Sequence, residues 1–139
     1  MAVIIAQTED EIRACWPVMA QLRPHLNESD FVAAVQRQVG EGFKLAYIRS
    51  GEKVGAVAGF RLMHSLGWGR FCYVDDLVTD EQTRSSGLGK ELFDWLCEFA
   101  RAENCQRLDL DSAVHRFGAH RFYLRNRMNI TCHHFTLEL

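Results

Sequence analysis

The chain has 139 residues, of which 47% are hydrophobic and 24% are charged, and its net charge at pH 7 is -2. These values fit one globular domain covering residues 1–139, and they argue against nucleic acid or an anionic membrane as the partner. No apolar run approaches the roughly 20 residues of a membrane-spanning helix, and the first residues lack the regions of a secretory signal. Five cysteines without a C-x-x-C pair indicate free thiols and a cytoplasmic protein.

The N-terminal third predicts one short strand and two helices. Val3–Ile5 is suited to a strand, and Thr8 followed by Glu11 is the capping-box pattern of a helix start. Pro17 lies within the helical spacing that follows, so we expect a kink or a break there. A second helix is predicted from Ser29 or Asp30 to Val39.

The remainder predicts a meander followed by a β-α-β unit. An apolar stripe at helical spacing follows Gly87, which opens a strong helix. This order indicates an α/β (α+β) fold with a mixed sheet and helices on its faces. The expected strands are Phe43–Arg49, Val54–Met63, Phe71–Thr79, Arg107–Asp111 and a closing strand Ile130–Leu139, with a helix from Phe117 to Arg125 or Asn126 before the last of them.

The segment between Leu77 and Lys90 has the pattern of a phosphate-binding loop. A strand ends, a polar loop follows, and glycines stand where a helix begins. The amides at a helix N-terminus bind anions, and Gly87 and Gly89 carry no Cβ atom to keep a phosphate away. Arg84 and Lys90 add positive charge. Plain turn chemistry is the alternative explanation of these glycines.

Two known phosphate-binding patterns do not fit this loop. The dinucleotide pattern G-x-G-x-x-G fails because Leu92 stands at the third glycine position. The P-loop pattern fails because Lys90 is followed by Glu91.

Two motifs resemble the GNAT superfamily of acetyltransferases. Arg84-Ser85-Ser86-Gly87-Leu88-Gly89 is similar to its [QR]-x-x-G-x-[GA] motif, and Ala119-His120-Arg121-Phe122-Tyr123 is similar to its A-x-x-F-Y segment. The order of predicted elements also resembles this family, whose central strands splay apart. The part from Phe43 onward resembles small bacterial enzymes that acetylate amines such as aminoalkylphosphonates.

The resemblance implies an N-acetyltransferase that uses acetyl-CoA as cosubstrate and acetylates a primary amine, of a small molecule in the first instance. It implies that Tyr123 protonates the leaving thiolate, that no metal takes part, and that a homodimer is one expectation. The pyrophosphate of coenzyme A would be held by Arg84, Ser85, Ser86, Gly87, Leu88, Gly89 and Lys90, and the pantetheine arm by Leu77, Val78 and Thr79.

Asp75 and Asp76 are the candidates for the general base. An alkyl amine with a pKa near 10.4 is neutral in about one molecule per thousand at pH 7, so a base accelerates its attack on a thioester. Neighbouring strand residues normally point to opposite faces, so one of the two would face the cleft unless a bulge interrupts the strand. We favour Asp76; a solvated strand end or recognition of a charged substrate are the alternatives.

The sequence departs from the family pattern after the tyrosine. Family members often end this helix with Gly-Phe, where this chain has Arg127 and Met128, so Asn126 is expected to take the left-handed conformation. Arg116 stands where the family often has asparagine. The arginines Arg121, Arg125 and Arg127 fit either a solvated face or a contact to the 3′-phosphate of coenzyme A.

The acceptor cleft is expected between Trp16–Phe31 and Met63–Arg70, by the same resemblance. Six histidines show no metal-binding spacing on a helix. The rival functions are an acyl-CoA sensor without turnover, an unrelated nucleotide-binding protein, and acetylation of a protein or peptide amine.

Overall fold

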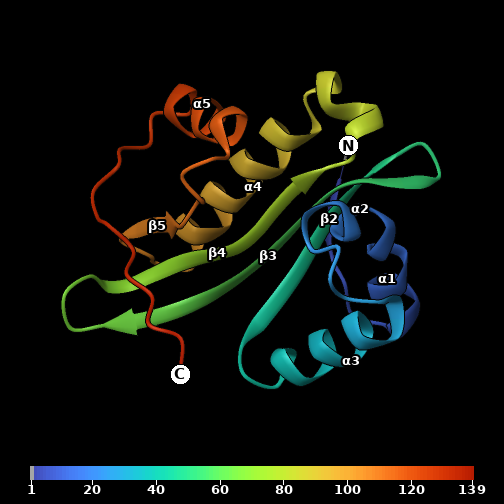
Figure 1. Cartoon of the computed structure of the whole chain (residues 1–139), viewed down its shortest axis with the longest axis horizontal. Helices are drawn as coiled ribbons and strands as arrows, with labels where there is room; N and C mark the ends of the chain where they lie inside the picture. Colours follow the sequence, from blue (N-terminus) through green and yellow to red (C-terminus); the bar gives the residue numbers. More distant parts are fainter. Residues whose placement is uncertain (1) are drawn as a thin grey trace. The chain divides into compact units, whose positions relative to one another are not determined.

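The computed structural model describes residues 2–139, and the chain divides into one compact unit that ends at Asp109 and a second, Leu110–Leu139. A mixed five-stranded sheet has the order β1-β2-β3-β4-β5 (Figure 1). The pairs β1–β2, β2–β3 and β3–β4 are antiparallel, and β2 to β4 form the three-stranded meander that was predicted. The mixed α/β fold is thereby confirmed. The strands are β1 (Val3–Ile5), β2 (Phe43–Ser50), β3 (Lys53–Ser65), β4 (Gly69–Thr79) and β5 (Arg107–Leu110).

Three helices, not two, lie between β1 and β2: α1 (Glu9–Ala14), α2 (Trp16–Leu22) and α3 (Glu28–Val39). The capping box at the start of α1 is confirmed, because the Glu11 amide donates to Thr8 Oγ1 at 3.2 Å and the Thr8 amide donates to Glu11 Oε1 at 3.3 Å. Pro17 occupies the first turn of α2. A missing N–H is tolerated in the first turn of a helix. The helix therefore ends before Cys15, and a new helix begins after it.

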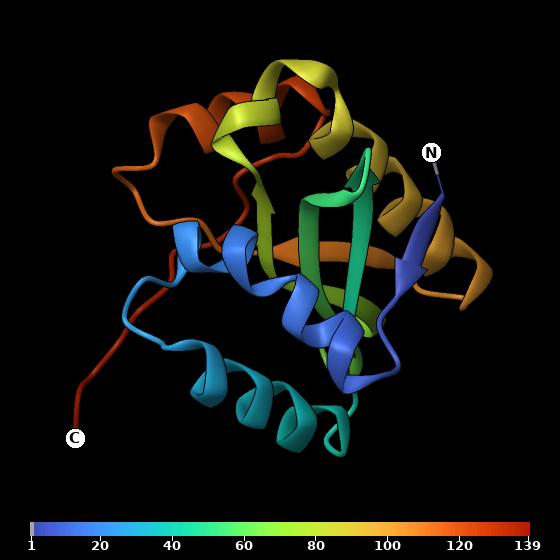
Figure 2. The same cartoon turned by 90° about the vertical axis from the view of Figure 1, so that its right-hand side faces the viewer.

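The sheet separates two layers of helices. Helices α1 to α3 cover one face and α4 (Leu88–Ala102) covers the other (Figure 2). Val57 and Tyr47 belong to the core beneath α1 to α3. Phe60 points to the opposite face, where its ring centroid lies 6.0 Å from that of Trp95 and 5.4 Å from that of Phe99. The period-two alternation of β3 therefore supplies both layers of the core.

The second unit contains α5 (Phe117–Arg125) and a C-terminal segment without regular structure. The expectation of a closing strand over Ile130–Leu139 is wrong in this structure, because residues 128–139 form neither helix nor strand. Phe135 is 91% exposed and Leu137 is 84% exposed. β-Branched and aromatic residues favour a strand only where a neighbouring strand pairs with them, and no such pairing is formed.

The end of α5 also differs from the expectation. Arg127, not Asn126, takes the left-handed conformation, with φ of +69° against -88° for Asn126. The Met128 amide donates to the Tyr123 carbonyl at 3.1 Å and the Arg127 amide donates to the Leu124 carbonyl at 3.0 Å. These two bonds form a Schellman motif. Arg127 therefore occupies the glycine position of that motif despite its Cβ atom.

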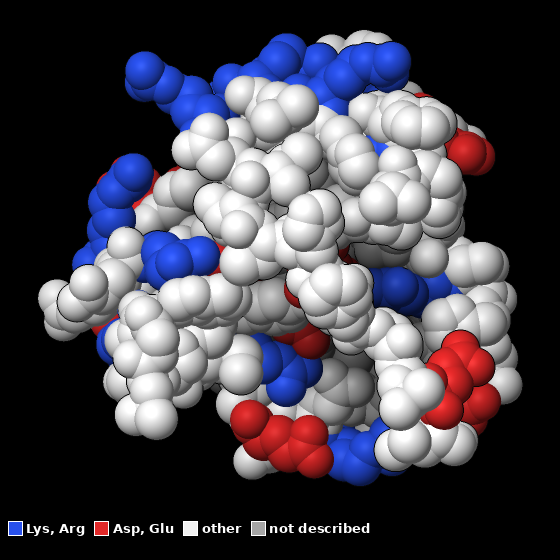
Figure 3. All heavy atoms as spheres, turned by 60° about the vertical axis from the view of Figure 1, so that its left-hand side comes forward, with Lys and Arg blue, Asp and Glu red and all other residues white. Residues whose placement is uncertain are grey.

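Charged side chains of both signs appear on the face shown in Figure 3. Lys and Arg form several groups on this face, and so do Asp and Glu, among larger areas of other residues. This mixture agrees with a sequence that has 16 Lys and Arg against 18 Asp and Glu. No helix among residues 2–139 combines the length and apolar character that a membrane crossing requires.

Candidate functional site

The glycine-rich segment joins the end of β4 to the start of α4. A 3-10 helix, η1 (Glu81–Ser86), fills the predicted polar loop, and the side chain of Asp80 caps it by accepting from the Gln82 amide at 3.1 Å. Gly87 then takes a φ of +83°, and it stands between the end of η1 and the start of α4. A residue with a side chain would be strained there, so this turn needs glycine.

The N-terminus of α4 presents backbone amides without a side-chain cap. Gly87 has no side chain to accept from them, and the first bond of the helical ladder runs from the Glu91 amide to the Gly87 carbonyl at 3.0 Å. The amides of Leu88, Gly89 and Lys90 precede that bond. Because these donors lie at the positive end of a helix of 15 residues, the arrangement suits an anion such as a phosphate.

The two glycines serve different purposes. A Cβ atom on Gly87 would meet nothing within 4 Å, so the space beside this residue is open. A Cβ atom on Gly89 would lie 2.7 Å from Oγ1 of Thr79. Gly89 therefore lets α4 pack closely on β4, and the expectation that both glycines make room for a phosphate stays a prediction.

The side chains of this segment differ in availability. The side chain of Leu88 is buried, so Leu88 can contact a ligand only through its backbone amide. Lys90 Nζ lies 2.7 Å from Asp94 Oδ2, which compensates part of its charge, and Ser86 Oγ donates to the Thr83 carbonyl at 2.5 Å. Arg84 and Ser85 are exposed. Arg84 is therefore the more available of the two predicted cationic groups.

The second half of β4 has an edge that β5 does not cover. Leu77, Val78 and Thr79 pair with β3 on one side. On the other side, β5 has only four residues, and it begins where the Gln106 amide donates to the Arg70 carbonyl at 2.8 Å. Four residues extend for about 13 Å, whereas β4 has 11 residues and extends for about 36 Å. Leu77–Thr79 is the stretch at which the family resemblance predicts pairing with a pantetheine arm.

A β-bulge in β4 places both candidate carboxylates on one face. Gly59 pairs with Asp76 and Phe60 pairs with Val74, so Asp75 is the extra residue. Tyr73 and Asp75 line the same cavity as Asp76 although strict alternation would separate Asp75 from Asp76. The two alternatives for the general base therefore both face the cleft.

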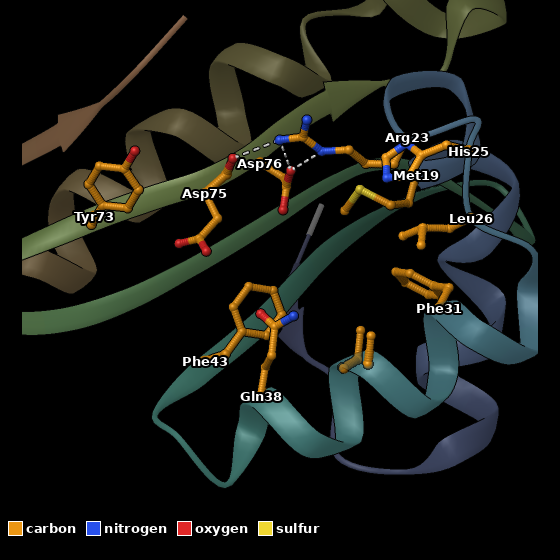
Figure 4. Close-up of a pocket in the computed structure, with 12 residues that line it drawn as sticks. Met19, Arg23, His25, Leu26, Phe31, Gln38, Phe43, Tyr73, Asp75 and Asp76 are labelled. Atoms are coloured by element: carbon orange, nitrogen blue, oxygen red, sulfur yellow. Dashed lines mark hydrogen bonds and ion pairs between the residues drawn. The ribbon is translucent and has the colours of Figure 1, made fainter. Parts of the chain in front are cut away.

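The cavity has a volume of about 370 Å³ and lies within the first unit (Figure 4). Its apolar wall comes from the α2–α3 region, and its polar wall comes from β4 and the loop after α2. Several residues of the range 16–31, where the acceptor cleft was expected, line this cavity, whereas none of residues 63–70 does. The lining residues are Met19, Arg23, His25, Leu26, Phe31, Ala34, Val35, Gln38, Phe43, Tyr73, Asp75 and Asp76.

Asp76 forms an ion pair with Arg23. Arg23 Nε lies 2.7 Å and Nη2 lies 2.6 Å from Oδ1 of Asp76 (Figure 4). The Asp76 side chain is only 15% exposed. Burial raises the pKa of Asp76 above its ordinary value, and the Arg23 guanidinium acts in the opposite direction. A carboxylate with a raised pKa is better suited to take a proton from an amine than an ordinary one.

Asp75 is held in a different way. Arg61 donates from Nε to Asp75 Oδ1 at 3.1 Å and from Nη2 to Oδ2 at 2.7 Å. The same Nη2 also donates to Gln38 Oε1 at 3.0 Å, and the guanidinium lies over the Phe43 ring at 5.2 Å. Both oxygens of Asp75 are thus engaged by a fork-shaped partner. Asp75 is better suited to fixing the cleft than to accepting a proton.

Tyr123 lies on α5 in the second unit. Burial raises the pKa of Tyr123, and the nearby Arg116 acts in the opposite direction. A phenol of ordinary pKa near 10 is already protonated at neutral pH, so Tyr123 has a proton to donate and the raised pKa makes it a weaker acid. Arg116 therefore has an electrostatic relation to Tyr123 that the sequence pattern did not indicate.

Sequence reasoning missed three residues that shape the cleft. Arg23 and Arg61 pair with the two carboxylates, and Gly59 leaves room beside them. A basic residue within the expected lining 16–31 was the only signal that could have suggested Arg23. Among residues 2–139, no group of His, Cys, Asp and Glu is arranged to hold a metal ion.

A family model for the acetyltransferase (GNAT) family matches residues 5–127. The chain belongs to the GNAT family. It is therefore an acyltransferase, and the family membership predicted from the two sequence motifs is confirmed. Both motifs, at residues 84–89 and 119–123, lie within the matched range.

Two curated relatives of this GNAT protein carry N-acetyltransferase names. The N-acetyltransferase YhdJ of Bacillus subtilis (strain 168) is 29% identical over 117 residues, which cover 84% of this chain and 82% of that protein. The aminoalkylphosphonate N-acetyltransferase of Salmonella typhimurium is 32% identical over 100 residues, which cover 70% of this chain and 62% of that protein.

Solved structures share the fold at low sequence identity. The ribosomal-protein-alanine N-acetyltransferase of Brucella melitensis has a TM-score of 0.85 at 13% identity, with all of both chains covered (100% and 100%). The aminoglycoside N-acetyltransferase AAC(6')-Iy, solved in complex with CoA, has a TM-score of 0.85 at 10% identity and covers 99% of this chain and 95% of that one. At these identities the likeness shows the fold alone.

Proposed function

We propose that this GNAT protein transfers the acetyl group of acetyl-CoA to a primary amine of a small molecule, by direct attack of the amine on the thioester. The observation that carries the proposal is the course of β4. This strand places Asp75 and Asp76 in a cavity and then continues through an open edge at Leu77–Thr79 to the uncapped start of α4. An acceptor site and an anion site thus lie along one strand.

The anion site fits the diphosphate of coenzyme A. Its amides at Leu88, Gly89 and Lys90 have no side-chain cap, and the space beside Gly87 is open. Arg84, Ser85 and Ser86 supply further polar groups at its rim. Solved GNAT neighbours include one in complex with CoA, which supports the same ligand for this chain.

The residues of the cleft have separate tasks in this proposal. When bound, acetyl-CoA supplies the acetyl group: the bond between the amine nitrogen and the carbonyl carbon forms, and the bond between that carbon and sulfur breaks. Asp76 accepts the proton that the ammonium group must lose before attack. Asp75 and Arg61 hold the bulged strand in place.

Tyr123 donates the proton that the leaving sulfur takes up. This role rests on the match of residues 119–123 to the family segment A-x-x-F-Y, and a phenol carries its proton at neutral pH. The attacking nitrogen releases one proton to solvent as the amide forms and the tyrosine regains one from solvent, so one cycle consumes acetyl-CoA and free amine and yields amide and thiol.

A small-molecule acceptor is favoured over a protein lysine. A cavity of about 370 Å³ falls at the low end of the volumes of small-molecule sites. The relative from Salmonella typhimurium is named for a small amine, which supports the same class.

The proposal is tested first by binding and then by turnover. Acetyl-CoA at a hundredfold excess over its dissociation constant is expected to stabilise the fold by about 2.7 kcal/mol, whereas ATP and NAD produce no shift. A panel of primary amines is then screened for thiol release. Stabilisation by ATP or NAD in place of acetyl-CoA contradicts the proposal, and stabilisation by acetyl-CoA without turnover of any amine identifies a sensor.

A further inference from the structure

The side chain of Gln21 joins α2 to the loop that precedes α4. Its Nε2 donates to Oδ1 of Asp80 at 3.1 Å, and its Oε1 accepts from the Glu81 amide at 3.0 Å. Oδ1 of Asp80 also caps η1, because it accepts from the Gln82 amide. One carboxamide thus uses its donor and its acceptor on the two residues at which η1 begins, which a carboxylate or an alkyl side chain cannot do.

Two contacts of this part of α2 bracket Leu77–Thr79, the stretch of β4 at which the family resemblance predicts pairing with a pantetheine arm. Arg23, directly after α2, pairs with Asp76 before this stretch (Figure 4). Gln21 pairs with Asp80 after it. The end of α2 is thereby tied to the chain on both sides of the predicted pantetheine stretch.

The same end of α2 contributes to the acceptor cavity, since Met19, two residues before Gln21, lines it. The loop is otherwise anchored to β3, where the Gly55 carbonyl accepts from the Asp80 amide at 2.8 Å and from Thr83 Oγ1 at 3.3 Å. Among residues 2–139, no other side chain of α1 to α3 forms a hydrogen bond with Asp80 or with η1. Gln21 is therefore the hydrogen-bonded link between the loop and the cavity wall.

The position of this loop matters for the chemistry of the cleft. In the proposed reaction, the amides at the start of α4 hold the diphosphate of the donor, and η1 leads directly to them. A loop that is ordered before binding spares the ligand the entropy cost of ordering it. A misplacement of about 1 Å between reacting groups can lower a rate by about a hundredfold. A link between the loop and the cavity wall therefore serves both donor affinity and alignment.

We infer that Gln21 is a positioning residue, which fixes the donor-binding loop against the acceptor cavity through Asp80 and Glu81. The inference rests on the proposed acetyl transfer. Gln21 is exposed and does not line the cavity, so it contributes neither to the core nor to a contact with the amine. Donor binding and the order of α2 are accordingly coupled, because a donor that holds the loop also holds the end of α2 through this side chain.

The test measures this coupling with acetyl-CoA as the probe, in the wild type and in Gln21→Ala. Alanine has a higher helix propensity than glutamine, so the substitution does not weaken α2 itself. By calorimetry, the dissociation constant of acetyl-CoA is expected to rise by about threefold to tenfold, the value of a net hydrogen bond. Gln36→Ala removes an exposed glutamine of α3 that forms no hydrogen bond among residues 2–139, and it is expected to leave the constant unchanged. An unchanged constant in Gln21→Ala contradicts the inference.

Hydrogen exchange separates positioning from a purely structural role. The amides of Met19 and Arg23 are hydrogen-bonded within α2. In the wild type, saturating acetyl-CoA is expected to slow exchange at these two amides and at the start of α4. In Gln21→Ala, the slowing at α4 is expected to remain and the slowing at Met19 and Arg23 to be lost. Equal slowing at these two amides in the wild type and in the variant would show that the coupling does not pass through Gln21, and it would overturn the inference.

The outcome for the underlying activity is read separately. Absence of acetyl-CoA binding in the wild type would overturn the proposed function and the inference together. Binding of acetyl-CoA that slows exchange at the start of α4, without any effect on α2 in the wild type, would overturn the inference alone, and the proposed function would stand.

Discussion

Gly59 and Asp76 lie opposite each other in the β3–β4 ladder, at the last pair before the bulge. A Cβ atom on Gly59 would lie 2.5 Å from Cζ of Phe43 and 3.2 Å from Oδ2 of Asp76. The missing side chain of Gly59 therefore leaves room for both the Phe43 ring and the Asp76 carboxylate on this part of the sheet. One small residue thus links the packing of β2 to the geometry of the acceptor cleft.

Gly59→Ala is expected to destabilise the fold by about 1–3 kcal/mol, because Phe43 must move within a packed core. Gly67→Ala is the matched control, since a Cβ atom there meets nothing within 4 Å, and its effect is expected to stay within about 0.5 kcal/mol. Urea unfolding measures both. Equal midpoints for the two variants would contradict this account of Gly59.

Asp76→Asn is expected to lower kcat by about 10²- to 10⁴-fold, because the amide cannot accept the proton of the ammonium group. Asp75→Asn is expected to act mainly on stability, since its carboxylate is held by Arg61. Thiol release at saturating acceptor measures the first effect, and thermal unfolding measures the second. A larger loss of kcat in Asp75→Asn than in Asp76→Asn would reverse the assignment.

The raised pKa of Asp76 has a consequence for stability. Its ordinary value is 3.8, and burial raises the pKa in the folded state. The unfolded chain therefore releases this proton at lower pH than the folded one, so Asp76 contributes stability that is lost as the pH rises from about 3.8 through the folded pKa. Relative to Asp76→Asn, the wild type is expected to lose unfolding free energy over this window. If urea unfolding gives the same pH dependence of the unfolding free energy for the wild type and for Asp76→Asn, the pKa of Asp76 is not raised in the folded state.

Arg127→Gly is expected to stabilise the second unit by about 0.5–1 kcal/mol. It relieves the left-handed strain of a residue with a side chain, and part of the gain is offset by the flexibility of glycine in the unfolded chain. Arg125→Gly, one turn position inside α5, is expected to destabilise by about 1 kcal/mol. Thermal unfolding of the two variants should shift in opposite directions, and a shift in the same direction would refute the strain.

Tyr123→Phe is expected to lower kcat by about 10²- to 10⁴-fold while acetyl-CoA still stabilises the fold. Tyr47→Phe is the control, because its hydroxyl donates to Glu11 Oε2 at 3.1 Å in the core. That variant is expected to cost about 1 kcal/mol of stability and to leave kcat unchanged. Full activity in Tyr123→Phe would show that the thiolate takes its proton from another group, and it would refute the role of Tyr123.

Local signals in the sequence were sufficient for most elements. Thr8 and Glu11 are three residues apart, so their capping contacts are nearly fixed by the chain itself. The turn at Gly87 and the apolar stripe of α4 are likewise local patterns, and both are formed. The open choice between Asp75 and Asp76 followed from an alternation rule that holds only for a strand without a bulge.

The break expected at Pro17 is formed at Cys15, and it adds a third helix to the two that were expected. The failures concern features that residue types alone do not specify. The segment 130–139 has the composition of a strand, but a strand also needs a partner. Asn126 has the greater intrinsic tendency toward positive φ, yet the hydrogen bonds at the end of α5 place that conformation at Arg127.

The sequence by itself determined the family, the mixed α/β fold and the glycine turn before α4, because motifs and periodicity depend on residues close together in the chain. Only the tertiary structure decided that Asp75 and Asp76 share one face and that Arg23, 53 residues before Asp76, pairs with it. Strand register and ion pairing join distant segments, and their energies depend on the burial that the complete fold creates. The proposed acceptor cleft accordingly depends on the folded chain, whereas the glycine turn proposed to bind an anion depends on a short stretch of sequence.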